Sequence, residues 1–146
     1  MKMIQYKTGN LFTSNADAYA QGCNTKGKMN AGIALQFKER FPEMFEDYQQ
    51  RCRNGLFLPG DGYMFKNQNP PHIINLATQG ESGAGLEYID QAFNWLSDTF
   101  NELEISNVAM PKIGSGLGGL NWELTKKILE DHFNDSKLNV EVWSPQ

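Results

Sequence analysis

The strongest periodic pattern in the chain lies between residues 86 and 103, where apolar side chains recur every three or four positions. They are Leu86, Ile89, Ala92, Phe93, Leu96, Phe100 and Leu103. This spacing places them on one face of a helix, so we expect an amphipathic α-helix over 86–103. Another helix is predicted over 121–133, because Asn121 can cap its first turn and Glu123 suits the positive end of the helix dipole.

Two more helices are predicted in the first half of the chain, on either side of Pro42. The segment 33–41 has helical spacing, and a proline can both end one helix and occupy the first turn of the next. The second helix should cover 42–55, where Gly55 is a typical stop signal.

Strands are predicted where apolar and polar positions alternate, or where short apolar runs lie between turn residues. The expected strands cover 3–7, 17–23, two segments within 60–78 joined by a turn at 67–71, 107–111 and 138–143. The small residues of 17–23 suit a central strand with other groups packed closely above it. Because strands and helices alternate, the sequence predicts an α/β fold with a mixed sheet and helices on both faces.

Composition and charge narrow the range of partners. The 146 residues fit one domain, with 40% apolar and 21% charged residues. The sequence shows neither the pattern of a signal peptide nor an apolar run long enough to cross a membrane. We therefore expect a cytoplasmic protein without a membrane partner. We also expect a monomer. The net charge of −4 disfavours general nucleic-acid binding but permits one small anionic ligand held by backbone N–H groups.

The cysteines and histidines do not have the spacing of a metal site. Cys23 and Cys52 are too few for a disulfide framework, and His72 and His132 begin neither an HxH nor an HExxH pattern. We expect reduced cysteines that serve in packing, and neither a metal nor a cofactor.

A loop dense in glycine follows the predicted strand 107–111. Its residues are Gly114, Ser115, Gly116, Leu117, Gly118 and Gly119. Glycine loses more backbone freedom on folding than any other residue, so such a run indicates positive φ angles or a ligand close to the backbone. The loop is similar to a phosphate cradle, although it lacks the GK[ST] ending of a P-loop and differs from the Rossmann fingerprint.

The loop 24–32 has a related character and leads directly into a helix, whose first N–H groups lack intrahelical acceptors. These are the amides of Gly32, Ile33 and Ala34, which can hold a phosphate. Asn24 offers an amide that can donate to and accept from a sugar hydroxyl. A glycine-rich cap with a turn-forming Asn explains this loop equally well by itself. Ligands bind at the carboxyl ends of strands in such sheets, so we expect 24–32 and 111–120 to lie side by side around a diphosphate.

Three stretches of the chain resemble the macro domain, an ADP-ribose-binding module: TGNLF (8–12), NTKGKMNAGIALQFKERFP (24–42) and MPKIGSGLGGLNW (110–122). The resemblance covers essentially the whole chain. It is closest to the branch that contains the terminal ADP-ribose protein glycohydrolase and the macro-domain antitoxin that removes ADP-ribose from DNA. It implies a three-layer α/β/α macro-domain fold with a central mixed β-sheet, formed as a single macro domain by residues 1–146.

The resemblance also implies where ADP-ribose would lie. Asn10 would accept the adenine amino group in place of the usual Asp, and Trp143 would stack on the base unless it is a core residue. Residues 32–34 and 114–118 would surround the two phosphates, and Asn24 would orient the distal ribose. The remaining ligand contacts are expected at Leu11, Asn30, Thr78 and Pro111.

Two positions depart from the glycohydrolase branch. Gln79 stands where those enzymes have a catalytic lysine, and Gly118 stands where they can carry an acid. A glutamine cannot form a Schiff base, so Asn24 and Gln79 are the candidate catalytic residues, helped by a phosphate of the substrate. Lys26 and Lys28 could approach the distal ribose or be solvated loop charges.

Three functions remain open at this point. The first is hydrolysis of a substituent at the distal ribose, as an ADP-ribosyl hydrolase or an ADP-ribose 1''-phosphate phosphatase. The second is a non-catalytic reader or sponge of ADP-ribose, and the third is a different nucleotide-binding α/β protein. The expected partner is ADP-ribose itself or an ADP-ribosylated protein or nucleic acid.

Overall fold

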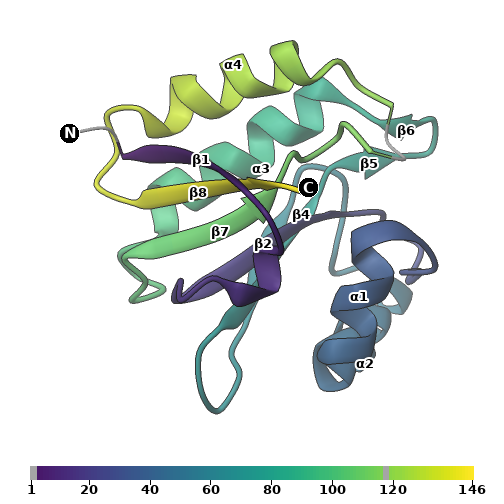
Figure 1. The fold of residues 1–146 in the computed structure, drawn as a ribbon. Coiled ribbons are helices and arrows are strands. Elements are labelled where there is room, and N and C mark those ends of the chain that lie inside the picture. The colour runs from purple at the N-terminus through teal and green to yellow at the C-terminus, as the bar shows by residue number, and fades with distance from the viewer. Residues whose placement is uncertain (1–2, 117–118) are drawn as a thin grey trace.

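A six-stranded sheet forms the middle layer of the computed structural model, which describes residues 3–116 and 119–146 (Figure 1). The strands in spatial order are β1 (Ile4–Thr8), β8 (Asn139–Ser144), β7 (Asn107–Pro111), β2 (Ala18–Cys23), β4 (His72–Ala77) and β3 (Gly62–Phe65). Every pairing is parallel except that of β3 with β4. The mixed sheet is therefore confirmed, and the small-residue strand β2 lies in its interior.

Helices cover both faces of this sheet (Figure 1). On one face lie α3 (Leu86–Thr99) and α4 (Trp122–Phe133), and on the other lie α1 (Gly32–Arg40) and α2 (Pro42–Arg53). The three-layer α/β/α architecture is confirmed. No helix in the described part of the chain is long and apolar enough to cross a membrane.

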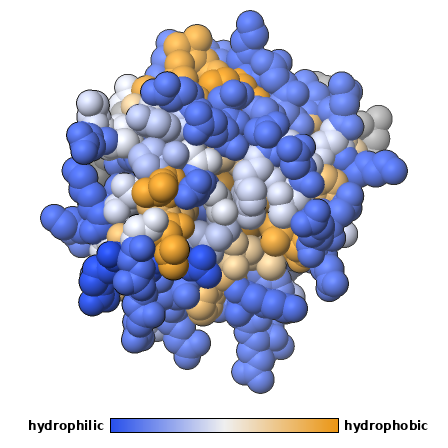
Figure 2. All heavy atoms as spheres, turned by 180° about the vertical axis from the view of Figure 1, so that it is seen from behind, coloured by the Kyte–Doolittle hydropathy of each residue, from blue (hydrophilic) through white to orange (hydrophobic). Residues whose placement is uncertain are grey.

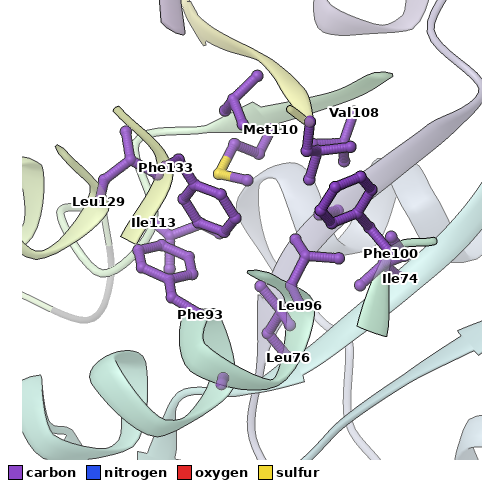
Figure 3. Packing of buried hydrophobic residues seen from close by; sticks show 14 of the residues in the cluster. Ile74, Leu76, Phe93, Leu96, Phe100, Val108, Met110, Ile113, Leu129 and Phe133 are labelled. Carbon is purple, nitrogen blue, oxygen red and sulfur yellow. The ribbon is translucent and has the colours of Figure 1, made fainter. Parts of the chain in front are cut away.

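One hydrophobic core fills the space between the sheet and the pair α3 and α4. Phe93, Leu96 and Phe133 from these helices point toward Ile74 and Met110 of the strands (Figure 3). All five side chains are almost fully buried. This packing uses the apolar stripe that the sequence predicted for the helix beginning at Leu86, because burial of that stripe stabilises the helix against the sheet.

A second core lies between the sheet and α1 and α2. Phe37, Met44 and Tyr48 of these helices are buried there against strand residues that include Ile73 and Ala77. Surface apolar side chains form only small separate patches on the face opposite the view of Figure 1 (Figure 2). Each layer therefore buries its apolar face within the domain.

The end of α3 differs from the prediction. The regular helix stops at Thr99 instead of residue 103. Glu104 has a φ of 60°, and the N–H groups of Glu104 and Ile105 donate to the carbonyls of Asn101 and Phe100. This pattern is a Schellman motif, which ends a helix by satisfying its last carbonyls. The apolar period continues to 103 because the final turn still packs on the core.

Two short elements were not predicted. The 3-10 helix η1 (Leu11–Thr13) follows β1, and a hairpin of β5 (Gln79–Gly80) and β6 (Gly83–Ala84) follows β4. Both are too short for a periodic pattern to reveal them. Both nevertheless contribute residues to the site described next.

Candidate functional site

A cleft of about 1060 Å³ opens at the carboxyl ends of β2, β4, β7 and β8. Its lining includes residues of both glycine- and asparagine-rich loops, so the prediction that 24–32 and 111–120 lie side by side is confirmed for the described residues. Every described residue that the sequence assigned to the site lines this cleft: Asn10, Leu11, Asn24, Asn30, Gly32, Ile33, Ala34, Thr78, Gln79, Pro111, Gly114, Ser115, Gly116 and Trp143. Leu117 and Gly118 lie outside the described residues.

The charge of the cleft differs from that of the whole chain. Lys28 and Lys112 line it, and no Asp, Glu or His occurs in the part of its lining that the structure describes. The chain as a whole carries 17 acidic and 13 basic side chains. The described cleft is thus suited to an anion, and it lacks the groups that most often serve as general acid or base.

The glycines of the loop after β7 have two different roles. Gly114 has a φ of 83°, and an added Cβ would lie 2.9 Å from Ile89 Cδ1, so the fold itself requires glycine at this position. Gly116 has no positive φ, and an added Cβ would meet nothing within 4 Å. Gly116 lines the cleft, so its lack of a side chain leaves room for a ligand. The fold itself does not require glycine at this position.

The N-terminus of α1 lies across the cleft from this loop. Ala31 is its N-cap residue and makes no side-chain capping bond. The first N–H groups of the helix, from Gly32, Ile33 and Ala34, therefore have no intrahelical acceptor. All three residues line the cleft, where their amides and the positive end of the helix dipole can bind a phosphate.

Asn24 holds its own loop together. Its Oδ1 accepts from Lys26 N at 2.9 Å and from the Tyr48 hydroxyl at 2.6 Å, and its Nδ2 donates to Lys28 O at 2.9 Å. Burial raises the pKa of Tyr48, so this hydroxyl stays protonated and donates. The two lone pairs of Oδ1 are thus occupied, and the amide of Asn24 keeps one N–H for a ligand; its contact with a distal ribose stays a prediction.

Tyr48 was missed as part of the site. The spacing of the buried residues Met44 and Tyr48 on α2 indicates a core position. The hydroxyl of Tyr48 could have identified it as a site residue. A buried phenol needs a hydrogen-bond partner, and a neighbouring loop is a source of such partners.

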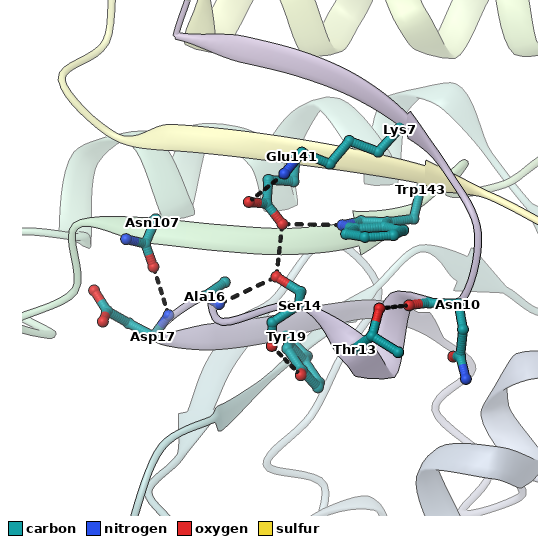
Figure 4. A network of polar contacts seen from close by, with 10 residues as sticks. All are labelled: Lys7, Asn10, Thr13, Ser14, Ala16, Asp17, Tyr19, Asn107, Glu141 and Trp143. Carbon is teal, nitrogen blue, oxygen red and sulfur yellow. Dashed lines mark hydrogen bonds and ion pairs between the residues drawn. The ribbon is translucent and has the colours of Figure 1, made fainter.

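Trp143 also lines the cleft and is held in place by Glu141 (Figure 4). Glu141 Oε1 accepts from Trp143 Nε1 at 3.0 Å and from Ser14 Oγ at 2.6 Å, and Lys7 Nζ lies 3.2 Å from Oε2. Trp143 is half-buried against the second core and also faces the cleft. The indole is thus fixed before a ligand binds, whereas its stacking on adenine stays a prediction.

Asn10 lines the cleft as well, next to Gly9, which adjoins the Trp143 ring, and caps η1. Its Oδ1 accepts from Phe12 N at 3.0 Å, which uses one lone pair of that oxygen. A second lone pair can still accept the amino group that the sequence assigned to it.

Thr78 and Gln79 connect β4 to the hairpin. Thr78 is buried, its N–H donates to Cys23 O at 3.1 Å, and an added Cβ on Gly22 would lie 2.7 Å from Thr78 Oγ1. Gln79 pairs with Ala84 in the hairpin and is half-buried. Close packing fixes the backbone that presents Gln79 to the cleft.

Glu141 should make the stability of the protein depend on acid pH. Burial raises its pKa, but hydrogen bonds from Ser14, Trp143 and Lys7 outweigh this and hold the pKa below its usual 4.5. A lowered folded-state pKa stabilises the fold at pH above the unfolded value, and this contribution is lost as the pH falls through the folded value. We expect the free energy of unfolding to decrease more steeply below about pH 5 in the wild type than in Glu141→Gln.

Urea unfolding at several pH values measures this difference. The matched control is Glu102→Gln, which changes an exposed acid after α3 that is in none of the hydrogen bonds or ion pairs of the described residues and should keep the wild-type slope. Equal slopes for the wild type and Glu141→Gln would show that Glu141 makes no stabilising contribution.

Fold and cleft together define a class of protein: a three-layer α/β/α domain that can hold an anionic ligand between a glycine-rich loop and a helix N-terminus. The sequence model of the Macro domain family matches residues 20–129. The chain belongs to the macro domain family.

Similar proteins come from bacteria and yeast. The chain is 38% identical over 136 residues to a DNA ADP-ribosyl glycohydrolase of Mycobacterium tuberculosis, which covers 90% of this chain and 39% of that protein. It is 29% identical over 165 residues to an ADP-ribose 1''-phosphate phosphatase of Candida albicans, covering 96% of this chain and 99% of that protein. The solved macrodomain of Mycobacterium tuberculosis DarG matches with a TM-score of 0.92 and 34% identity, covering 100% of both chains. The chain thus spans 39% of the length of the mycobacterial glycohydrolase.

Proposed function

We propose that this macro domain binds ADP-ribose and hydrolyses the bond between its distal ribose and a substituent. The observation that carries the proposal is the cleft, which is lined both by the first amides of α1 and by the loop after β7 and has no Asp or Glu side chain among its described lining residues. The diphosphate would lie between these two walls, with adenine at Trp143 and the distal ribose near Asn24 and Gln79. We also propose that residues 1–146 act as one macro domain.

In the proposed reaction, water attacks C1'' of the distal ribose and the bond from C1'' to the substituent breaks. The water oxygen stays on C1'', one of its protons remains there as part of the new hydroxyl, and the other proton goes to the departing group. Gln79 and Asn24 would orient the water and the ribose, and a phosphate oxygen of the substrate would accept the second proton from the water and pass it to the departing group. Amides fixed along both walls would stabilise the negative charge that develops.

The similarity to hydrolytic enzymes supports hydrolysis. One relative is a DNA ADP-ribosyl glycohydrolase and another is an ADP-ribose 1''-phosphate phosphatase. A reader of ADP-ribose without catalysis is the second candidate. It is favoured by Gln79, which cannot form a Schiff base, and by the absence of an acid from the described lining.

Two measurements test the proposal. Calorimetry should give micromolar binding of ADP-ribose, about −8 kcal/mol, and much weaker binding of AMP, which lacks the second phosphate and the distal ribose. A turnover assay should use ADP-ribosylated DNA, ADP-ribosylated protein and ADP-ribose 1''-phosphate. Binding without release from any of these substrates would contradict hydrolysis and leave the reader, and failure to bind ADP-ribose would contradict both.

A further inference from the structure

A second, smaller hollow lies beside the cleft, and we call it the side recess. It has a volume of about 280 Å³ and is lined by Thr25, Lys26, Gly27, Gln49, Cys52 and Arg53. The segment 24–28 separates the two hollows, because Asn24 and Lys28 line the cleft while the three residues between them line the side recess. A group attached to a ligand at Asn24 would therefore have the side recess directly beside it.

Helix α2 fixes the shape of the side recess. Gln49 Nε2 donates to Gly27 O at 3.2 Å. Gly27 is buried with a φ of 78°, and an added Cβ would lie 3.8 Å from Gln49 Cγ and 3.9 Å from Cys52 Cβ. The hydrogen bonds of Asn24 hold the other side of the same loop. Both faces of the segment 24–28 are thus positioned by the fold.

The charge of the side recess is positive. Lys26 and Arg53 are exposed at its rim, neither forms an ion pair within the described ranges, and no Asp or Glu is among its lining residues. Burial raises the pKa of the Cys52 thiol, which keeps it uncharged. An ammonium and a guanidinium together suit the oxygens of a phosphate, which the guanidinium can bind with two parallel hydrogen bonds.

We propose that the side recess binds a phosphodiester group of a nucleic-acid strand that carries ADP-ribose. This inference rests on the proposed function, since it requires the distal ribose to lie at Asn24. A nucleic-acid strand has a phosphate beside every nucleotide, so one lies next to the modified nucleotide in any sequence. A peptide offers a carboxylate only where Asp or Glu occurs. The side recess therefore fits a nucleic-acid substrate better than a protein substrate.

The test uses three fluorescent conjugates that cannot be hydrolysed. Each carries ADP-ribose joined at its distal ribose through a triazole to a pentanucleotide, a neutral pentapeptide or an acidic pentapeptide. Fluorescence anisotropy gives the dissociation constants at about 50 mM salt, where exposed charges are weakly screened. We expect the wild type to bind the nucleotide conjugate about threefold to tenfold more tightly than the neutral peptide conjugate.

The double variant Lys26→Gln/Arg53→Gln should abolish this preference without changing the affinity for free ADP-ribose. Lys127→Gln/Lys137→Gln, which removes two exposed positive charges that do not line the side recess, is the control and should leave the preference intact. The preference should also decrease as salt increases, with a slope of about 0.7 per phosphate contact on a logarithmic plot.

Three results would overturn the inference. Equal affinity of the wild type for the nucleotide and neutral conjugates excludes the phosphodiester site, as does a preference that survives in the double variant. An equal gain with the acidic peptide shows general attraction of anions instead. If free ADP-ribose also fails to bind, the proposed function itself is wrong, which separates that outcome from failure of the side recess alone.

Discussion

Gly116→Trp should lower the affinity for ADP-ribose by about a hundredfold or more, because it would remove backbone hydrogen bonds to a charged phosphate. Gly116 lines the cleft, and an added Cβ would meet no protein atom within 4 Å. The indole would therefore fill ligand space without disturbing the packed domain. The free energy of unfolding should stay close to that of the wild type. Calorimetry with ADP-ribose and urea unfolding measure the two quantities.

Gly116→Ala is the control for the size of the added side chain. Its single methyl group should reduce the affinity for ADP-ribose much less than the indole does. Gly114 provides a contrast, since its positive φ and its contact with Ile89 predict that Gly114→Ala lowers the free energy of unfolding. If Gly116→Trp folds and binds ADP-ribose like the wild type, this loop does not form the phosphate cradle.

Asn24→Ala should reduce turnover by about a hundredfold, because a small displacement of the reacting centre is enough for such a loss. The side chain joins Lys26, Lys28 and Tyr48, so its removal would loosen the loop at which we propose that the distal ribose binds. Affinity for free ADP-ribose should decrease much less, since the adenine and diphosphate contacts remain. Single-turnover kinetics on the substrate that the panel identifies, together with calorimetry, separate the two effects.

Tyr48→Phe is the matched variant for this prediction. It removes the hydroxyl that lies 2.6 Å from Asn24 Oδ1 and leaves the asparagine in place. If Asn24 acts through the order of its loop, Tyr48→Phe should also lower turnover, although less than Asn24→Ala does. Wild-type turnover in Asn24→Ala would show that this residue has no part in the reaction.

Local sequence patterns predicted the layered α/β architecture because the spacing of apolar residues depends on which face of each helix or strand is buried. The stripe that begins at Leu86 identified α3, and the Asn121 cap with Glu123 identified the start of α4. The small residues of β2 indicated its interior position. The ends of elements were predicted less well, as at Thr99, because the αL residue that completes the Schellman motif is Glu104 and not the usual glycine.

The site was predicted as far as its loops were recognisable. Glycines and asparagines after β2 and β7 pointed to the cleft because parallel strands bring their carboxyl ends to one edge of the sheet. The sequence could not distinguish Gly114 from Gly116, since the first is required by a contact with Ile89 on a different element.

The sequence by itself determined the α/β class, the four helices, the six strands of the main sheet and the two loops that line the cleft. Only the tertiary structure decided how the residues of the cleft are held. Tyr48 reaches Asn24 from 24 positions away, and Glu141 reaches Ser14 across 127 positions. Such pairs leave no periodic signal, because hydrogen bonds between distant segments depend on the packing of whole helices and strands. The same reason applies to the side recess, which Lys26 and Arg53 line together only because α2 packs against the loop after β2.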